Sequence, residues 1–115
     1  MNVDFSRRMF SAIDAQQFDT LHEFFTSDVV YERPGYPPIR GLPALEHFYR
    51  NVRIIDSGCH DLWHVVGDPV AAACWGRFTG RSRQGDPLDE RFADVYELRD
   101  GKIALRATHF YRAAI

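Results

Sequence analysis

Apolar residues recur at helical spacing in three segments of the first half of the chain. The first segment carries a stripe in which every fourth residue is apolar, formed by Phe5, Met9 and Ile13. The second follows Asp19, a residue type that caps helices, and its apolar positions are Leu21, Phe24 and Phe25. The third starts after Gly41, with Pro43 in its first turn, and its apolar positions are Leu45, Phe48, Tyr49 and Val52. This pattern predicts three helices, each with one face to bury.

Alternating and β-branched residues predict strands in the rest of the chain. A short strand at 29–33 stops at residues 34–38, where prolines prevent regular ladder hydrogen bonding. Four further strands, joined by turns rich in Gly and Asp, are expected at 59–66, 70–81, 88–98 and 102–112. Consecutive hairpins form an antiparallel sheet, and one face of that sheet is the only large partner for the helices. The prediction is an α+β fold, with three N-terminal helices packed on a curved antiparallel sheet in one domain spanning 1–115.

Composition restricts the classes of function. The chain has 115 residues, 45% of them hydrophobic and 26% charged, and a net charge of −2, which is typical of one globular domain without a field that attracts nucleic acid. Its apolar runs are far shorter than the roughly 20 residues that cross a bilayer, and it shows no secretion signal. A cytoplasmic protein without membrane contact is therefore expected. Cys59 and Cys74 lack zinc-ligand spacing and are expected to be buried free thiols.

One carboxylate lies among aromatic residues on a predicted strand. Every second residue of 92–98 shares a face, and that face is apolar except at Asp94. Burial favours the neutral acid, so Asp94 is a candidate proton donor or base. The alternative is a structural ion pair with Arg106, which shares the face of Asp94 if residues 99–101 form a three-residue turn with Gly101 left-handed. Both interpretations can hold, because Arg106 inside a pocket would keep Asp94 ionised as a base.

Histidine is the other residue type that exchanges protons near neutral pH. His60 and His64 are expected to share one strand face with Leu62, and His60 is the stronger candidate for a pocket. His109 is a weaker candidate. A metal site formed by His60, His64 and Asp94 is not expected, because residues four apart on a strand are separated by about 13 Å.

The order of the elements resembles the nuclear transport factor 2-like superfamily. The motifs that carry the resemblance are Phe25-Thr26-Ser27-Asp28-Val29-Val30-Tyr31, Gly41-Leu42-Pro43-Ala44-Leu45 with Phe48-Tyr49, and Phe92 through Ile103. Members include SnoaL-like polyketide cyclases, ketosteroid isomerases and limonene epoxide hydrolases. The resemblance implies a cone-shaped fold around a pocket and chemistry that needs no cofactor.

Single positions separate these relatives from one another. Asp94 falls where the isomerases keep a protonated acid that donates to the substrate oxyanion. Arg33 replaces the catalytic base of the isomerases, and Met9 replaces their oxyanion tyrosine. Thr108 stands near the last acid of the Asp-Arg-Asp set that the hydrolases use. The SnoaL-like cyclases, which need one acid/base residue and a pocket, therefore give the best match.

The resemblance and the strand pattern together mark a set of pocket residues. Tyr31 shares the inward face of the first strand with Arg33 and is expected to donate a hydrogen bond to a ligand carbonyl. The proposed catalytic residues are Asp94, His60 and Tyr31. The residues expected to contact substrate are Arg33, Tyr49, Phe78, Tyr96, Arg106, Thr108 and Phe110. For each aromatic residue the alternative is a role in the core.

These expectations describe a cofactor-independent general acid/base enzyme that acts on a small hydrophobic oxygenated natural product by cyclisation, isomerisation or epoxide opening. The alternative is a non-catalytic ligand-binding or assembly module of the same fold, with a filled cavity and Asp94 locked to Arg106. A homodimer is expected in either case. It would cover an apolar and aromatic face of the sheet formed by Trp75, Arg77, Val95, Leu105 and Tyr111.

Overall fold

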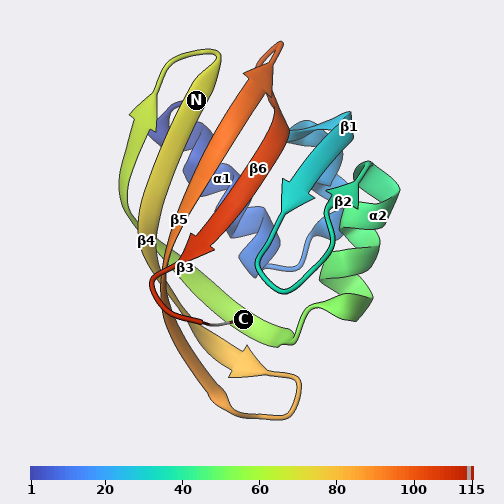
Figure 1. Ribbon diagram of the computed structural model, residues 1–115, viewed down its shortest axis with the longest axis vertical. Coiled ribbons are helices and arrows are strands. Elements are labelled where there is room, and N and C mark those ends of the chain that lie inside the picture. The colour runs from blue at the N-terminus through green and yellow to red at the C-terminus, as the bar shows by residue number, and fades with distance from the viewer. Residues whose placement is uncertain (114) are drawn as a thin grey trace.

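A strongly curved six-stranded sheet wraps around the first helix (Figure 1). The structure, a computed structural model, describes residues 1–113 and 115. In chain order the elements are α1 (Val3–Asp14), the 3₁₀ helix η1 (Phe18–Glu23), β1 (Phe25–Glu32), β2 (Ile39–Arg40), α2 (Leu42–His47), the π-helical turn η2 (Phe48–Val52), β3 (Ile55–Gly67), β4 (Ala71–Ser82), β5 (Pro87–Arg99) and β6 (Lys102–Phe110). The sheet order is β2-β1-β6-β5-β4-β3. The predicted α+β class is confirmed.

The helices cover the concave face of the sheet and differ from the prediction in detail. Asn2 caps α1 by accepting a hydrogen bond from the backbone N–H of Phe5 at 2.8 Å. The second helix is a 3₁₀ turn whose flanking residue Gln17 makes no side-chain cap, so the predicted cap at Asp19 is wrong. Phe25 begins β1 instead of ending that helix. The residues that follow Phe25 include β-branched ones, and their pairing with β6 stabilises a strand more than a short helix would be stabilised.

The sheet is mixed, whereas the sequence predicted an antiparallel one. β1 pairs with β6 in parallel, and the other neighbours are antiparallel. β1 starts four residues earlier than predicted, β3 starts at Ile55, β6 ends at Phe110, and the two-residue β2 was not predicted. The parallel pair joins strands separated by most of the chain, and no local pattern specifies such a partner.

A bulge in β6 decides which residues face the core beside Asp94. The β5–β6 turn has two residues, Asp100 and Gly101, both with positive φ, so the predicted three-residue turn is wrong. That turn alone would place Arg106 on the opposite face from Asp94. However, the register shifts by one residue between Glu97 and Leu98, and Arg106 returns to the face of Asp94. The predicted shared face is thus confirmed, for a different reason.

A second bulge separates the two histidines of β3. Leu62 lies opposite Gly76, but His64 lies opposite Trp75, so Trp63 is the extra residue. His64 is exposed, and its ring lies 5.1 Å from the ring of Trp75 on the outer face. The prediction that His60 and His64 share a face is therefore wrong, because one inserted residue reverses the alternation of a strand.

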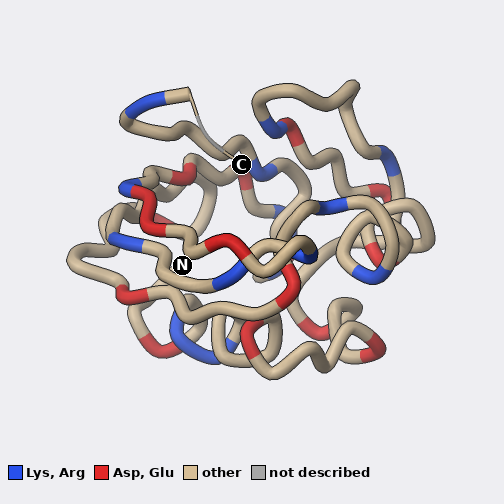
Figure 2. Tube along the Cα trace, turned by 90° about the horizontal axis from the view of Figure 1, so that it is seen from below, with Lys and Arg blue, Asp and Glu red and all other residues tan. Residues whose placement is uncertain are grey.

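The surface carries mixed charge. Figure 2 shows acidic and basic residues interspersed along the chain, without a region of one sign. No helix in the described part of the chain is long and apolar enough to span a membrane. Cys74 is buried as predicted, but Cys59 is exposed, because its side chain points away from the core face that the next residue, His60, occupies.

Candidate functional site

A small cavity lies between the concave face of the sheet and the helices. Its volume is about 20 Å³, which is room for about one water molecule. Seven of the predicted site residues line this cavity: Arg33, Tyr49, His60, Phe78, Arg106, Thr108 and Phe110. Alternation along β3, β4 and β6 turns five of these side chains inward, whereas Arg33 follows β1 and Tyr49 lies on η2. The other lining residues are Ile13, Arg53, Ile55, Phe92 and Ile115.

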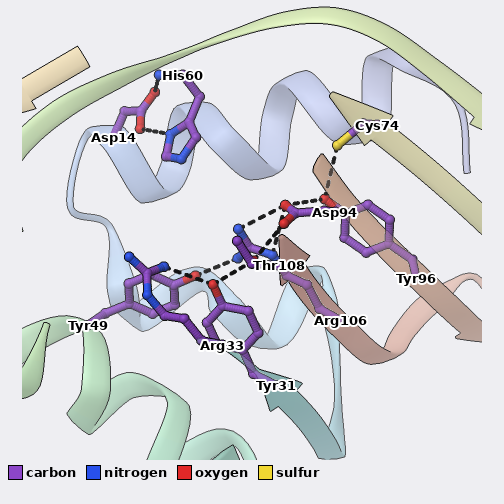
Figure 3. A network of polar contacts seen from close by, with 10 residues as sticks. All are labelled: Asp14, Tyr31, Arg33, Tyr49, His60, Cys74, Asp94, Tyr96, Arg106 and Thr108. Atoms are coloured by element: carbon purple, nitrogen blue, oxygen red, sulfur yellow. Dashed lines mark hydrogen bonds and ion pairs between the residues drawn. The ribbon is translucent and has the colours of Figure 1, made fainter. Parts of the chain in front are cut away.

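Three predicted site residues lie behind the cavity wall. Asp94 and Tyr31 are fully buried, and Tyr96 is 2% exposed. None of the three lines the cavity. They belong to a hydrogen-bonded network that supports the residues in front of them (Figure 3).

The Asp94 carboxylate is the acceptor at the centre of this network. The hydroxyl of Tyr96 and the Nε of Arg106 donate to one carboxylate oxygen at 2.9 and 3.1 Å. The hydroxyl of Thr108 donates to the other oxygen at 2.6 Å. A second nitrogen of Arg106 lies 3.1 Å from Asp94. Since Arg106 can only donate, the site requires an acceptor at Asp94, which favours the predicted alternative of structural pairing.

The Asp94 carboxylate also sets the direction of the hydrogen bonds that connect Thr108, Tyr31 and Arg33. Thr108 has one hydroxyl hydrogen and gives it to Asp94, so the hydroxyl of Tyr31, 2.8 Å away, donates to Thr108. Tyr31 in turn accepts from Arg33 at 2.9 Å. The Tyr31 hydroxyl thus donates to Thr108 and accepts from Arg33, and it does not point to a ligand.

Arg106 connects Asp94 to the cavity. One of its nitrogens donates to the hydroxyl of Tyr49 at 2.6 Å. Burial by itself disfavours the charge of Arg106, but the Asp94 carboxylate together with the nearby tyrosine hydroxyls outweighs burial and raises the pKa of Arg106 well above its ordinary value. Burial also raises the pKa of Tyr49, which stays a neutral phenol. The Tyr49 hydroxyl accepts from Arg106, and its own hydrogen remains for an acceptor in the cavity.

A histidine–carboxylate pair forms on the other side of the cavity. The Nδ1 of His60 lies 2.6 Å from one oxygen of Asp14, and the second oxygen accepts the backbone N–H of His60 at 2.8 Å. The two contacts fix both the ring and the strand at this point. In Figure 3 the second ring nitrogen of His60 faces the side on which Arg106 and Thr108 lie.

Burial sets the protonation of this pair. It lowers the pKa of His60 below its ordinary 6.5, although the hydrogen bond to Asp14 acts in the opposite direction. His60 is thus neutral at neutral pH. Because Asp14 requires a donor, the ring proton is on Nδ1, and Nε2 carries a lone pair. The arrangement is a general base held by a carboxylate.

The fold and this site can be compared with known proteins. A family model described as a SnoaL-like domain matches residues 6–106. The chain belongs to the SnoaL-like domain family. None of the curated proteins compared with the chain matches it.

Solved structures share the fold of this SnoaL-like domain at low sequence identity. A putative SnoaL-like polyketide cyclase from Jannaschia sp. CCS1 is 15% identical with a TM-score of 0.79, over 95% of this chain and 84% of that one. An LEH-like epoxide hydrolase from M. tuberculosis is 20% identical with a TM-score of 0.79, over 94% and 80%. A hypothetical protein with a ketosteroid isomerase-like fold from Catenulispora acidiphila DSM 44928, in complex with trimethylamine, is 11% identical with a TM-score of 0.84, over 100% and 91%. The predicted membership of the nuclear transport factor 2-like superfamily is confirmed.

Two residues of the SnoaL-like site were missed by the sequence analysis. Asp14 pairs with His60, and Arg53 lines the cavity. An acidic residue in the last turn of a helix opposes the helix dipole, and that unfavourable position was the one signal at Asp14. Arg53 directly follows the third predicted helix, and nothing in the local pattern distinguishes it from a surface residue.

Metal ligands are not gathered in the described part of this SnoaL-like domain. The described residues contain no group of three His, Cys, Asp or Glu side chains placed to hold an ion. His109, which was a weaker pocket candidate, is exposed and pairs with Ala93, away from the cavity.

Proposed function

We propose that this protein is a cofactor-independent general acid/base enzyme acting on a small hydrophobic, oxygen-bearing molecule such as a natural product. The observation that carries the proposal is the 2.6 Å contact between His60 and Asp14 at the cavity. A neutral histidine with one nitrogen held by a carboxylate and the other free to accept is a group that removes protons. Cyclisation, isomerisation and epoxide opening all require such a step.

The base and a hydrogen-bond donor lie on the same cavity. His60 takes a proton from a carbon next to a carbonyl group, and the Asp14 carboxylate stabilises the imidazolium that forms. Negative charge then develops on the substrate oxygen. The Tyr49 hydroxyl donates to that oxygen, and Arg106 strengthens this donor through their 2.6 Å contact. Asp94 acts through Arg106 and Thr108, as a positioning residue.

Proton exchange tests this step before the natural substrate is known. The assay follows loss of the α-proton NMR signal of small cyclic ketones in D₂O. His60→Gln is expected to lower the exchange rate by about 10²- to 10⁴-fold, the usual contribution of a positioned base. Because burial lowers the pKa of His60, the rate is expected to rise with pH below 6.5 and to be constant above it.

Two aspartates that differ in their contact with His60 serve as a pair in this assay. Asp14→Asn is expected to slow exchange, because the ring loses its fixed orientation. Asp61→Asn is the control, since Asp61 is exposed and, among the described residues, its side chain accepts a hydrogen bond only from Trp63 on β3. Exchange that is unaffected by His60→Gln, or no faster than with free imidazole, would contradict the proposal.

A second candidate is a ligand-binding or assembly module without chemistry. Two observations favour it: the cavity holds only about 20 Å³, and Asp94 is locked to Arg106. A protein of this kind would bind small apolar molecules with no exchange activity, and His60→Gln would leave binding unchanged. The exchange assay, run with binding measurements, separates the two functions.

We further propose that the protein forms a homodimer in the cytoplasm. The outer face of the sheet exposes apolar side chains that water would otherwise cover, with exposed fractions of 37% for Trp75, 43% for Val95 and 75% for Tyr111. Free thiols at Cys59 and Cys74 suit a reducing compartment. Sedimentation that gives a monomer mass at every concentration would remove the dimer from the proposal.

A further inference from the structure

The inner cavity is too small for the kind of substrate that a general base would act on. Its volume of about 20 Å³ holds about one water molecule, whereas pockets that bind small organic molecules measure about 300–1,000 Å³. His60 lines this cavity. An organic molecule can therefore reach the free nitrogen of His60 through the cavity only if one of the cavity walls moves.

A larger groove lies on the other side of one wall. It has a volume of about 350 Å³ and is lined by residues of η1, η2 and the start of β3. Tyr49, Arg53 and Ile55 line both the groove and the inner cavity, so they form the wall between the two spaces. The other residues that line the groove are Gln16, Phe18, Arg50, Asn51, Asp56 and Arg83.

Two of the three wall residues are held in place. Tyr49 accepts a hydrogen bond from Arg106 at 2.6 Å, and its ring stacks on that of Phe18 with the centroids 5.3 Å apart. Ile55 is 4% exposed and pairs with Ser82 in the sheet. Moving either side chain would break contacts on which the fold depends.

The side chain of Arg53 has no comparable anchor. Its Nε is buried and has no hydrogen-bond partner in the described part of the chain. The guanidinium lies over the rings of Phe18 and Tyr49 at 5.5 and 5.1 Å, and ring faces attract a cation without fixing the direction of its N–H groups. The backbone is fixed, since Arg53 donates its N–H to the carbonyl of Phe48 at 3.0 Å and its own carbonyl accepts from Arg83 at 2.7 Å. Movement is thus confined to the side chain.

Burial of this guanidinium is unfavourable. It lowers the pKa of Arg53 below its ordinary value, because the buried position disfavours the charged form. A buried N–H without an acceptor adds to the cost. The groove offers water and Asp56, an exposed acidic residue without an ion pair among the described residues. A guanidinium that turns into the groove therefore regains hydration and comes near an anion, which offsets the loss of the ring contacts.

We propose that Arg53 is a gate: its side chain turns into the groove, the two spaces join, and the substrate binds with its reacting end beside His60 and its outer end in the groove. The inference rests on the proposed function in that it describes how the substrate of His60 is bound. Polar residues line the groove, among them Gln16, Asn51 and Asp56, whereas aromatic rings contribute to the inner cavity. The joined site therefore takes an elongated molecule with an apolar reacting end and a hydrogen-bonding group at its outer end.

A second groove also reaches His60 and gives a competing route. It has a volume of about 300 Å³, lies between α1 and β3, and is lined by Ser11, Asp14 and Cys59 among others. The Asp14 carboxylate occupies the Nδ1 of His60 at 2.6 Å. The other ring nitrogen faces the side on which Arg106 lies (Figure 3). The route through the inner cavity is therefore the one that leads to the accepting nitrogen.

Diethyl pyrocarbonate measures access to His60, because it acylates the unprotonated nitrogen of an imidazole. Peptide mass spectrometry follows the rate of labelling at His60, with the exposed His109 as internal standard. A minor position is populated to about 10% or less, so Arg53→Ala, which removes the gate, is expected to raise the rate by about tenfold or more. Arg50→Ala is the matched control, because Arg50 lines the groove but not the cavity. Equal rates in Arg53→Ala and the native protein would overturn the proposal.

Two bulky substitutions distinguish the routes, and they do not depend on the folding of Arg53→Ala. Asn51→Trp fills the groove outside the gate and is expected to slow the labelling of His60. Ser11→Trp fills the second groove and is expected to leave the rate unchanged. Both positions are exposed, so neither substitution disturbs the core. The reverse pattern, or no effect of Asn51→Trp, would contradict the gate.

Two matched ketones test the class of substrate. A phenyl-substituted cyclohexanone and its para-hydroxyphenyl analogue differ only in the hydroxyl group that would lie in the groove. Calorimetry is expected to show tighter binding of the hydroxyl compound by about two- to tenfold in Kd, the usual contribution of a hydrogen bond. Arg53→Ala is expected to tighten the binding of both ketones by about tenfold, since no closed position competes with the ligand. Equal or weaker binding of the hydroxyl compound would contradict the polar outer end.

These measurements are independent of catalysis. Labelling of His60 and binding of ketones do not require removal of a substrate proton. A native protein without exchange activity, but with the expected labelling rates, would contradict the proposed function and not the gate. Conversely, exchange activity together with unchanged labelling in Arg53→Ala would contradict only the gate.

Discussion

Asp94→Asn tests whether the buried carboxylate is an ionised partner of Arg106 or a neutral acid. Asparagine has nearly the shape of a protonated aspartic acid and keeps one acceptor oxygen for Tyr96 and Arg106. The Thr108 hydroxyl can reverse and accept from the new amide. The substitution therefore removes mainly the charge that faces Arg106, 3.1 Å away.

The size of the loss follows from burial. Asp94 is completely buried and Arg106 is 3% exposed, so water cannot replace the missing charge. Removing one partner of a buried ion pair costs about 3–5 kcal/mol. The retained acceptor puts Asp94→Asn near the lower end, at about 3 kcal/mol. For a domain of this length, about 4 °C in Tm corresponds to each kcal/mol, giving a decrease of about 12 °C.

Urea unfolding followed by circular dichroism measures this difference in the free energy of unfolding. Asp89→Asn is the matched control, since Asp89 lies on the same strand and pairs with Arg77 at 2.6 Å. Both side chains of that pair are at least half exposed, so water and salt screen it and little stability is expected to be lost.

The reasoning fails if the two substitutions cost the same. An Asp94→Asn variant as stable as the native protein would mean that Asp94 is already neutral. The acid that the family resemblance implied would then be restored as a proton donor, and Arg106 would need another counterion.

Three further predictions follow from single residues. At pH 8 one thiol, that of Cys59, is expected to react with a thiol reagent, because burial raises the pKa of the Cys74 thiol to about 11; equal reaction rates would contradict this. Because burial lowers the pKa of His60, the unfolded chain binds the extra proton, so the free energy of unfolding is retained above about pH 6.5 and decreases below it. His60→Phe should lack this decrease in urea titrations at pH 5 and 7. Gly76→Ala places a methyl group against the backbone oxygen of Asp61 on β3 and is expected to cost at least about 2 kcal/mol of the free energy of unfolding. Gly85→Ala meets no neighbouring atom and should cost about 1 kcal/mol through its positive φ.

Sequence patterns predicted the faces of the long strands well where pairing is regular. The alternation of β5 correctly placed Phe92, Asp94 and Tyr96 on one buried face. The same reasoning failed at His64, because the bulge at Trp63 has no signal in the alternation. Asp94 shows another limit: its local neighbours are apolar, but its partners Arg106 and Thr108 come from the next strand.

The amino-acid sequence alone was enough to predict the α+β class and most of the residues that line the cavity, because periodic burial and turn residues are local properties. The family was indicated by the resemblance of three sequence motifs. Tertiary structure decided how those residues combine. The pairing of His60 with Asp14, across 46 positions of the chain, and the gathering of Arg33 and Arg53 at one cavity depend on the curvature of the sheet around α1. Charge, hydrogen bonding and burial act through space, and sequence spacing does not encode that proximity.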